Sequence, residues 1–387
     1  MQKKVRQQSS KSRLEQMKRQ PALVIVFLLA VIALIMILVF VAQLPRETGT
    51  EAGLAESGDR LAKIRSYTYE ETRELDLCGE RIISLSADHF QAQDLSGVEI
   101  ARENLNFHEL FYVTFQDSLI MGDRREPGQN IYYFQRDALL WSSPLSGTFA
   151  GARLSADVLA VIDNPDHGPP SLHLLKRTDG HRIYTLTFDE SGYIADFSFT
   201  PDGRALDVLL INTKTSDLKT IIKRYDLQGG QMAQFIPDLK NSFLHSLSYL
   251  GQDLVLYGED KIYFVKPDAE QGVQMLENPH VYRLFSHAGQ LYGIVQTKLG
   301  EPPELIKISG PEQVESLKTL PREAQMAEVM GSYLLLACGR DMIIYNLERQ
   351  SFQTSVTLPD EAIAMSYDGA GTAYILTPTS IQKLILN

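Results

Sequence analysis

Six charged side chains on polar loops are the best candidates in this sequence for contacts with a partner. They are Arg124, Arg125, Asp163, Asp166, His167 and Lys214. Such side chains recognise a partner through ion pairs and charge-assisted hydrogen bonds. Prolines such as Pro127 and Pro165 stiffen the same loops, and a stiff loop loses less conformational entropy on binding. The combination predicts a binding surface, with tolerated surface insertion as the alternative.

No motif for catalysis or metal binding accompanies these loops. The eight histidines are scattered without the close spacings of zinc sites, and no G-x-S-x-G nucleophile motif occurs. The paired carboxylates Glu70 and Glu71 lie in a polar stretch, which is typical of a solvated surface. The sequence therefore predicts a protein without catalytic residues, metal or cofactor.

A repeated unit of β-strands positions the loops. After Ser66, short runs rich in aliphatic and aromatic residues alternate with polar turns. One tight turn recurs at intervals of 38 to 48 residues, at Gly79, Asp117, Ala156, Gly203, Gly251, Gly289, Gly331 and Gly369. A period near 40 residues with four short strands per unit is typical of propeller blades. We expect an all-β propeller of seven or eight four-stranded blades, eight by repeat count; the alternative is a β-sandwich or two tandem β domains.

The loops between the second and third strands of the units differ in length. They are long in four units, at residues 122–130, 163–171, 212–218 and 296–304. In a propeller these loops emerge beside the blade-to-blade connections. We call this side the long-loop face and the opposite side, with the recurring turns, the tight-turn face. The six charged residues fall in three consecutive long loops, so we expect them to form a partner-binding rim.

The last repeat ends early, because it supplies only three strands before Asn387. We expect the β-prone segment Tyr67–Glu71 to act as the missing outer strand. Pairing the N-terminal strand with the C-terminal blade would close the ring and remove an exposed sheet edge.

The two cysteines, Cys78 and Cys338, invite a disulfide across this closure. The repeat places Cys78 at a tight turn, whereas Cys338 lies six residues beyond the tight turn of its own unit. Six strand residues span about 20 Å, and a disulfide needs Cα atoms within about 7 Å. We therefore expect two buried thiols instead of a disulfide.

An apolar segment near the N-terminus divides the chain. Ala22–Ala42 has 21 residues without a polar side chain, enough to cross a hydrocarbon core of about 30 Å. The preceding tail is basic while the net charge is −11, so the positive-inside rule places the tail in the cytoplasm and the acidic remainder outside. We expect a cytoplasmic tail (1–20), a single transmembrane helix (21–44), a stalk (45–66) and an extracytoplasmic propeller (67–387).

A cleaved signal peptide is the alternative to this anchor, but the apolar run is longer than such peptides carry. The acidic domain repels phosphate backbones, which argues against nucleic-acid binding.

Short motifs in the repeats resemble those of quinoprotein and YVTN-type propellers. The turns QDLSGVEI (93–100) and YDLQGGQM (225–232) are similar to the D-L-x-G turn of such repeats, and FTPDGRAL (199–206) is similar to their S-P-D-G hairpin. Quinone enzymes of this type use several tryptophans and often adjacent cysteines, whereas this chain has one tryptophan, Trp141. The whole resembles membrane-anchored propellers of unknown function in Gram-positive bacteria, and the resemblance implies no quinone.

These observations predict a non-catalytic scaffold or sensor of the cell envelope that binds a protein, peptide or wall component on the long-loop face. The alternative is an extracytoplasmic glycan-directed hydrolase or lyase with its site in the propeller funnel. A ring of aspartate, glutamate, histidine and arginine side chains at the funnel mouth would favour that alternative, because fold alone does not define function.

Overall fold

The computed structural model describes residues 60–386 except 69–74, 86–87, 116, 137, 190–191, 213–218, 236–243, 266–272, 278–279, 299, 311–312 and 354. The chain divides into two units, Met1–Glu56 and Ser57–Asn387, and every described residue belongs to the second. The predicted transmembrane helix (21–44) lies outside the described residues. Within the described part, no helix has the length and apolar character needed to span a membrane.

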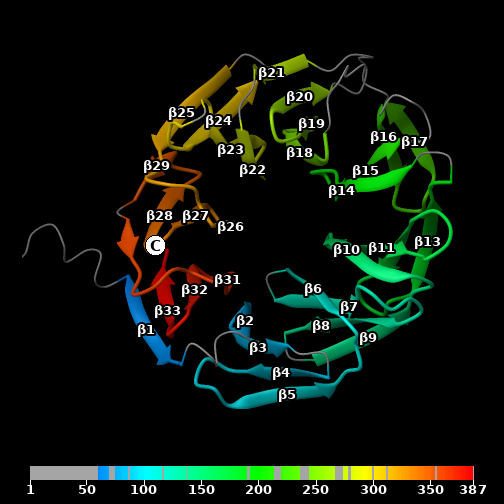
Figure 1. The fold of residues 1–387 in the computed structure, drawn as a ribbon, viewed down its shortest axis with the longest axis horizontal. Helices are drawn as coiled ribbons and strands as arrows, with labels where there is room; N and C mark the ends of the chain where they lie inside the picture. Colours follow the sequence, from blue (N-terminus) through cyan, green and yellow to red (C-terminus); the bar gives the residue numbers. More distant parts are fainter. Residues whose placement is uncertain are drawn as a thin grey trace, which may run out of the picture. The chain divides into compact units, whose positions relative to one another are not determined.

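The strands of the second unit form eight antiparallel sheets arranged in a ring (Figure 1). Seven sheets have four strands, and one has an additional short strand. The first strand of each sheet lies nearest the ring axis and the last lies at the rim (Figure 1). The chain is thus an eight-bladed β-propeller, which confirms the blade count predicted from the repeats and excludes a sandwich.

The first four blades follow one another along the chain, each with its strands in sequence order from the axis outward. Their strands are β2 (Leu75–Cys78), β3 (Arg81–Leu85), β4 (His89–Gln93) and β5 (Glu99–Asn104) in blade 1; β6 (Leu110–Phe115), β7 (Ser118–Asp123), β8 (Asn130–Gln135) and β9 (Ala138–Pro144) in blade 2; β10 (Thr148–Leu154), β11 (Val158–Asn164), β12 (Ser171–Lys176) and β13 (Arg182–Thr187) in blade 3; and β14 (Tyr193–Phe199), β15 (Ala205–Asn212), β16 (Lys219–Asp226) and β17 (Gln231–Phe235) in blade 4.

The other four blades complete the ring. Their strands are β18 (Ser246–Leu250), β19 (Asp253–Tyr257), β20 (Lys261–Val265) and β21 (Val273–Glu277) in blade 5; β22 (His280–His287), β23 (Gln290–Gln296), β24 (Glu304–Gly310) and β25 (Gln313–Thr319) in blade 6; β26 (Met326–Met330), β27 (Tyr333–Cys338), β28 (Asp341–Asn346), β29 (Ser351–Phe352) and β30 (Val356–Thr357) in blade 7; and β31 (Ala364–Tyr367), β32 (Thr372–Thr377), β33 (Ser380–Ile385) and β1 (Leu61–Ser66) in blade 8.

The hydrophobic core lies between neighbouring blades. Ile120 and Tyr133 of blade 2 belong to one buried cluster with Val161 and Leu175 of blade 3, and all four are fully buried. Because each sheet is covered on both sides, its middle strands are apolar on both sides: β7 is buried at every residue. This two-sided burial is why the strands lack a polar–apolar alternation in the sequence.

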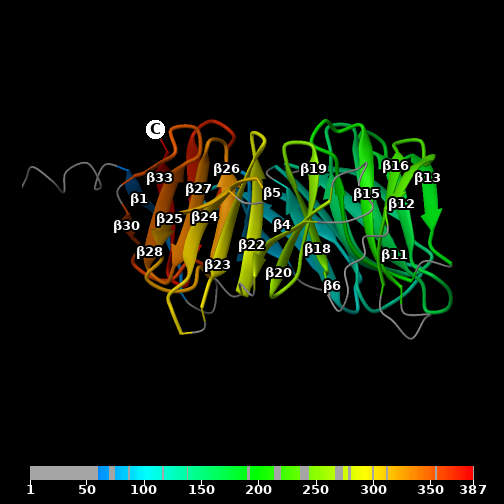
Figure 2. The ribbon, with the colours of Figure 1, turned by 90° about the horizontal axis from the view of Figure 1, so that it is seen from above.

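The recurring turn joins the first and second strands of each blade and lies near the ring axis. Gly79, Gly251 and Gly331 adopt φ angles of 57°, 57° and 59° there. A side chain in this left-handed region costs energy, which explains why glycine marks the repeat so often. In the side view the strands run across the thickness of the ring, so that the turns gather on two opposite faces (Figure 2).

The ring closes in blade 8, where β1 pairs with β33, Leu61 opposite Leu384 and Ser66 opposite Ser380. The predicted closure is confirmed, but the predicted strand is wrong. The closing strand is Leu61–Ser66, within the segment assigned to the stalk, whereas of Tyr67–Glu71 only Tyr67 and Thr68 are described. A bulge between Lys63 and Arg65 breaks the strand period, which is the physical reason for the error.

The bulge leaves the apolar side chains of β1 three residues apart. Leu61 packs on the cluster between blades 7 and 8, and Ile64 packs on the cluster between blades 8 and 1. In sequence this spacing resembles a helical turn. The two cysteines are buried, and no disulfide joins them, as predicted.

Candidate functional site

The long loop of blade 2 (residues 124–129) is fastened by a buried aspartate. Asp123, at the end of β7, accepts hydrogen bonds from the backbone N–H groups of Arg125 (2.8 Å), Glu126 (2.8 Å) and His108. Burial raises the pKa of Asp123, but these backbone bonds outweigh it and lower the pKa. The carboxylate thus ties the loop to the connection from blade 1.

The two arginines of this loop project outward. The Arg124 guanidinium lies over the ring of Phe111, 4.9 Å from the ring centroid. The backbone N–H of Arg124 donates to the Glu109 carbonyl (2.9 Å). Arg124 and Arg125 are exposed on the long-loop face, as the sequence predicted.

The same loop brings three possible metal-binding groups together. One ligand atom each of His108, Asp123 and Glu126 lies within 4.8 Å of the others. Both Asp123 oxygens already accept backbone hydrogen bonds, and His108 is in contact with Glu126. This cluster is explained by its role in fastening the loop.

Asp163, near the end of β11, fastens the connection between blades 2 and 3. Its carboxylate accepts hydrogen bonds from the Ser146 N–H (2.9 Å), the Ser146 hydroxyl (2.6 Å) and the Gly147 N–H (2.6 Å). The His173 imidazole lies 2.9 Å away through Nε2, and its Nδ1 lies 2.9 Å from the Thr185 hydroxyl. Asp163 is 0% exposed, so in this structure it supports the connection between β9 and β10 and does not line the surface.

Of the remaining candidate residues, the structure describes Asp166 and His167 but not Lys214. Asp166 and His167 are exposed in the loop between β11 and β12. They therefore lie on the same face as Arg124 and Arg125. Lys214 lies outside the described residues, as does nearly all of its loop.

We expect Asp163 to make stability depend on pH at acidic values. Burial raises its pKa, but the hydrogen bonds from His173, Ser146 and Gly147 outweigh this and lower the pKa from 3.8 to about 2. A depressed pKa gives stabilisation that is complete above the ordinary value and is lost as pH falls through about 2. Asp163→Asn should remove about 2 kcal/mol at neutral pH.

The measurement is the free energy of unfolding between pH 2 and pH 6, from denaturant titrations. Near pH 2, the free energy of unfolding of the wild type should approach that of Asp163→Asn. Asp166→Asn is the matched control in the same loop and should change stability little, because that carboxylate is exposed. A wild type and Asp163→Asn that differ equally at all pH values would contradict the assignment.

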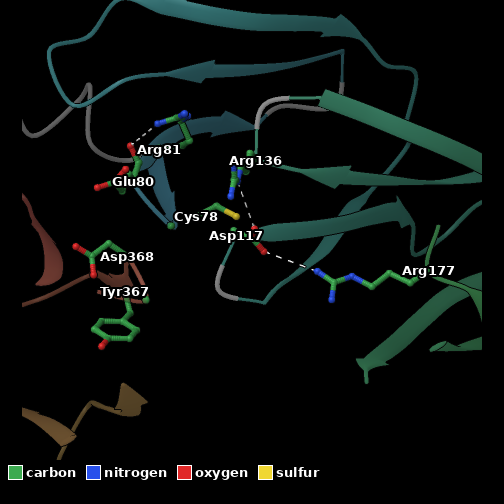
Figure 3. A pocket seen from close by; sticks show the side chains of 10 residues that line it. Cys78, Glu80, Arg81, Asp117, Arg136, Arg177, Tyr367 and Asp368 are labelled. Atoms are coloured by element: carbon green, nitrogen blue, oxygen red, sulfur yellow. Dashed lines mark hydrogen bonds and ion pairs between the residues drawn. The ribbon is translucent and has the colours of Figure 1, made fainter. Parts of the chain in front are cut away.

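A cavity of about 520 Å³ opens on the other side of the ring, on the tight-turn face. It lies among the tight turns of blades 8, 1 and 2, together with outer turns of blades 2 and 3 (Figure 3). Its charged lining residues are Glu80, Arg81, Asp117, Arg136, Arg177 and Asp368. We call this the turn-face pocket.

Two arginines of the turn-face pocket approach one carboxylate. Asp117 lies 3.7 Å from Arg136 Nε and 3.9 Å from an Arg177 nitrogen (Figure 3). Arg177 is held in place by bonds that its Nε donates to the Tyr133 hydroxyl (2.7 Å) and its NH2 group donates to the Ser118 hydroxyl (3.3 Å). Arg136 is more exposed, with 73% of its side chain accessible to solvent.

Burial and backbone hydrogen bonds set the protonation states of a thiol and a carboxylate in the pocket. Burial, with a contribution from the charge of Asp117, raises the pKa of Cys78 to about 12, so the thiol is not a nucleophile near neutral pH. Burial raises the pKa of Asp368, but backbone bonds from Thr372 and Ala370 outweigh it and lower the pKa. A general acid would need the opposite shift.

Sequence reasoning missed the turn-face pocket. Its residues come from turns in four blades, and each alone has the features of a solvated turn. The available signal was the repeat itself: Gly79, Asp117 and Gly369 occupy the same position of three adjacent blades, so their neighbours must converge near the axis.

These features define an eight-bladed β-propeller with charged loops on one face and a charged pocket on the other. The chain belongs to the family described as "Family of unknown function (DUF5711)", which matches residues 60–288. No curated protein sequence matches the chain.

Solved structures share the fold at low sequence identity. BamB from Moraxella catarrhalis is 11% identical with a TM-score of 0.52, over 84% of this chain and 100% of BamB. The computationally designed protein Ika8 is 10% identical with a TM-score of 0.56, over 80% of this chain and 95% of Ika8. An oligogalacturonate lyase in complex with manganese is 11% identical with a TM-score of 0.53, over 85% of this chain and 97% of the lyase. Such likenesses establish the fold alone.

Proposed function

We propose that the protein is a membrane-anchored, extracytoplasmic binding scaffold that recognises a protein, peptide or wall component on its long-loop face. The observation that carries this proposal is that two buried carboxylates fix neighbouring backbone on this face. Asp123 fastens the long loop of blade 2, and Asp163 fastens the connection between blades 2 and 3. That connection also bonds the same loop, because the Gly128 N–H donates to the Gly147 carbonyl (3.2 Å). A fastened loop presents its exposed side chains in a fixed arrangement and loses little entropy on binding.

The place where the chain enters the ring supports this choice of face. The Ile385 N–H donates to the Arg60 carbonyl (2.9 Å), and the Leu386 N–H donates to the carbonyl of Gly371 (2.9 Å), which lies between β31 and β32. Arg60 therefore lies on the tight-turn face. The chain therefore enters the ring on the face opposite the long loops, and the apolar run Ala22–Ala42 supports an anchor before that point in the sequence.

The experiment compares partner capture by variants of the full-length chain in membranes. A variant with Arg124, Arg125, Asp166 and His167 all replaced by alanine should lose at least about 90% of the chemical cross-links that the wild type forms. The control replaces Asp157 and Arg204, which are exposed in tight turns on the other face, and should retain them. Equal capture by all three proteins would contradict the proposed face.

A second function, glycan cleavage in the funnel, is favoured by one observation. Aspartate, glutamate and arginine side chains converge at the turn-face pocket, and convergence of these residue types is expected of a hydrolase or lyase site. No histidine is among the described lining residues, and the pKa of Asp368 is lowered. Release of new reducing ends from wall glycans by the wild type, but not by Asp117→Asn, would support this function over the scaffold.

A further inference from the structure

We propose that the turn-face pocket binds a small ligand through an oxyanion, a carboxylate or a phosphate, placed between Arg136 and Arg177. This site lies on the face opposite the long loops and goes beyond the proposed scaffold function.

Two arginines of the pocket share one carboxylate. Arg136 and Arg177 share the single carboxylate of Asp117, at 3.7 Å and 3.9 Å, so two guanidinium groups face one negative charge. Both distances exceed those of direct charge-assisted hydrogen bonds. The pairs are thus loose enough for guanidinium N–H groups to donate to an added oxyanion, which would supply the second negative charge.

The two other carboxylates of the pocket, Glu80 and Asp368, accept hydrogen bonds from groups other than its arginines. Asp368 accepts hydrogen bonds from the N–H groups of Ala370 (2.6 Å) and Thr372 (3.0 Å) inside its own turn. Glu80 accepts a hydrogen bond from the Tyr374 hydroxyl (3.2 Å). In the close-up view both lie on the side of the pocket away from Arg177 (Figure 3).

A third arginine adds to the positive potential. Arg81 NH1 donates to the Glu80 carbonyl at 3.4 Å, and its buried Nε has no hydrogen-bond partner among the described residues. No ion pair of Arg81 is found in the part of the chain that the structure describes. The pocket thus sets three arginines against the carboxylates of Glu80, Asp117 and Asp368. The arginines attract an anion most strongly where Arg136 and Arg177 share the one carboxylate of Asp117.

The size of the pocket sets the class of ligand. Its volume of about 520 Å³ falls within the roughly 300–1,000 Å³ of small-molecule sites. Arg177 is positioned in advance by Tyr133 and Ser118, so little ordering is needed on one side of the anion. The pocket suits a small acid or phosphate ester.

The test is isothermal titration calorimetry on the full-length chain in detergent micelles, with citrate and inorganic phosphate as separate probes and glucose as the uncharged control. Binding of citrate alone identifies a carboxylate site and binding of phosphate alone identifies a phosphate site, while heat from both indicates a general oxyanion site. Absence of saturable heat with both probes up to about 10 mM overturns the proposal, because a site with good charge-assisted hydrogen bonds has a dissociation constant below about 10 mM.

Two variants with opposite expected effects make the test specific. Arg136→Gln should weaken binding about tenfold or more, because it removes a donor to the anion. Asp117→Asn should tighten binding about tenfold, because it removes the competing carboxylate. Arg204→Gln, an exposed arginine in the tight turn of blade 4 that does not line the pocket, is the matched control and should bind as the wild type does.

An unchanged affinity in Arg136→Gln, or a weaker affinity in Asp117→Asn, overturns the proposal. Partner capture by the long-loop variant is measured on the other face, so failure of one proposal is distinguishable from failure of the other.

Discussion

Deleting β1 (Leu61–Ser66) should destabilise the propeller by on the order of 5 kcal/mol, more than any other change considered for this protein. The deletion removes the ladder with β33 and uncovers the clusters on which Leu61 and Ile64 pack. It also turns β33 into an exposed edge that can pair with other chains. We expect a thermal midpoint lower by about 10 °C or more, measured by circular dichroism, and a tendency to self-associate.

Point variants of the same strand separate packing from mere shortening of the chain. Ile64→Asp places a charge in the cluster between blades 8 and 1 and should reproduce much of the loss. Lys63→Asp changes the exposed neighbour and should have little effect. A deletion variant with the same thermal midpoint as the wild type would show that the stability of the ring does not depend on this closure.

Asp207→Ala should cost about 3–5 kcal/mol, because it removes the buried carboxylate that pairs with the Arg224 guanidinium. Asp207, on β15, is 0% exposed and accepts two hydrogen bonds from Arg224 of β16, both at 2.7 Å. The Tyr249 hydroxyl, from β18 of the next blade, donates to the same carboxylate at 2.9 Å. The cluster therefore joins blades 4 and 5, and its loss should appear in the free energy of unfolding.

The control for this prediction removes both charges at once. Asp207→Leu combined with Arg224→Met should cost far less than Asp207→Ala, because no unpaired charge stays buried. Asp202→Ala, in the exposed turn before β15, should also cost little. Equal losses in Asp207→Ala and the double variant would mean that packing, and not the ion pair, determines stability here.

The fold could be predicted from the sequence because its signals are local. Gly203, Gly289 and Gly369 adopt φ angles of 67°, 76° and 80°, which side chains avoid, so the turn is visible as a repeated glycine. The dense apolar strands followed from burial on both sides. The closing strand was placed at the wrong residues for two reasons. Its partner β33 lies near the other end of the sequence, and the bulge at Ile64 interrupts the two-residue alternation of a strand.

The sequence predicted the environment of a site residue correctly only where local polar composition determines its exposure. Arg124, Arg125, Asp166 and His167 are exposed on their loops, as polar composition suggested. Asp163 has the same local features in sequence, yet it is buried, because its partners Ser146 and His173 come from other strands and connections. The turn-face pocket depends on the relative placement of four blades, which local sequence patterns do not specify.

The direction of β1 has a mechanical consequence. The strand begins at Leu61 on the tight-turn face and runs antiparallel to β33, with its partners spread along its whole length. A pull on the chain that precedes Arg60, directed along this strand, loads all of these hydrogen bonds in shear at the same time instead of breaking them one after another. A tether attached in this way would transmit tension to the ring through its closing strand while keeping the ring shut.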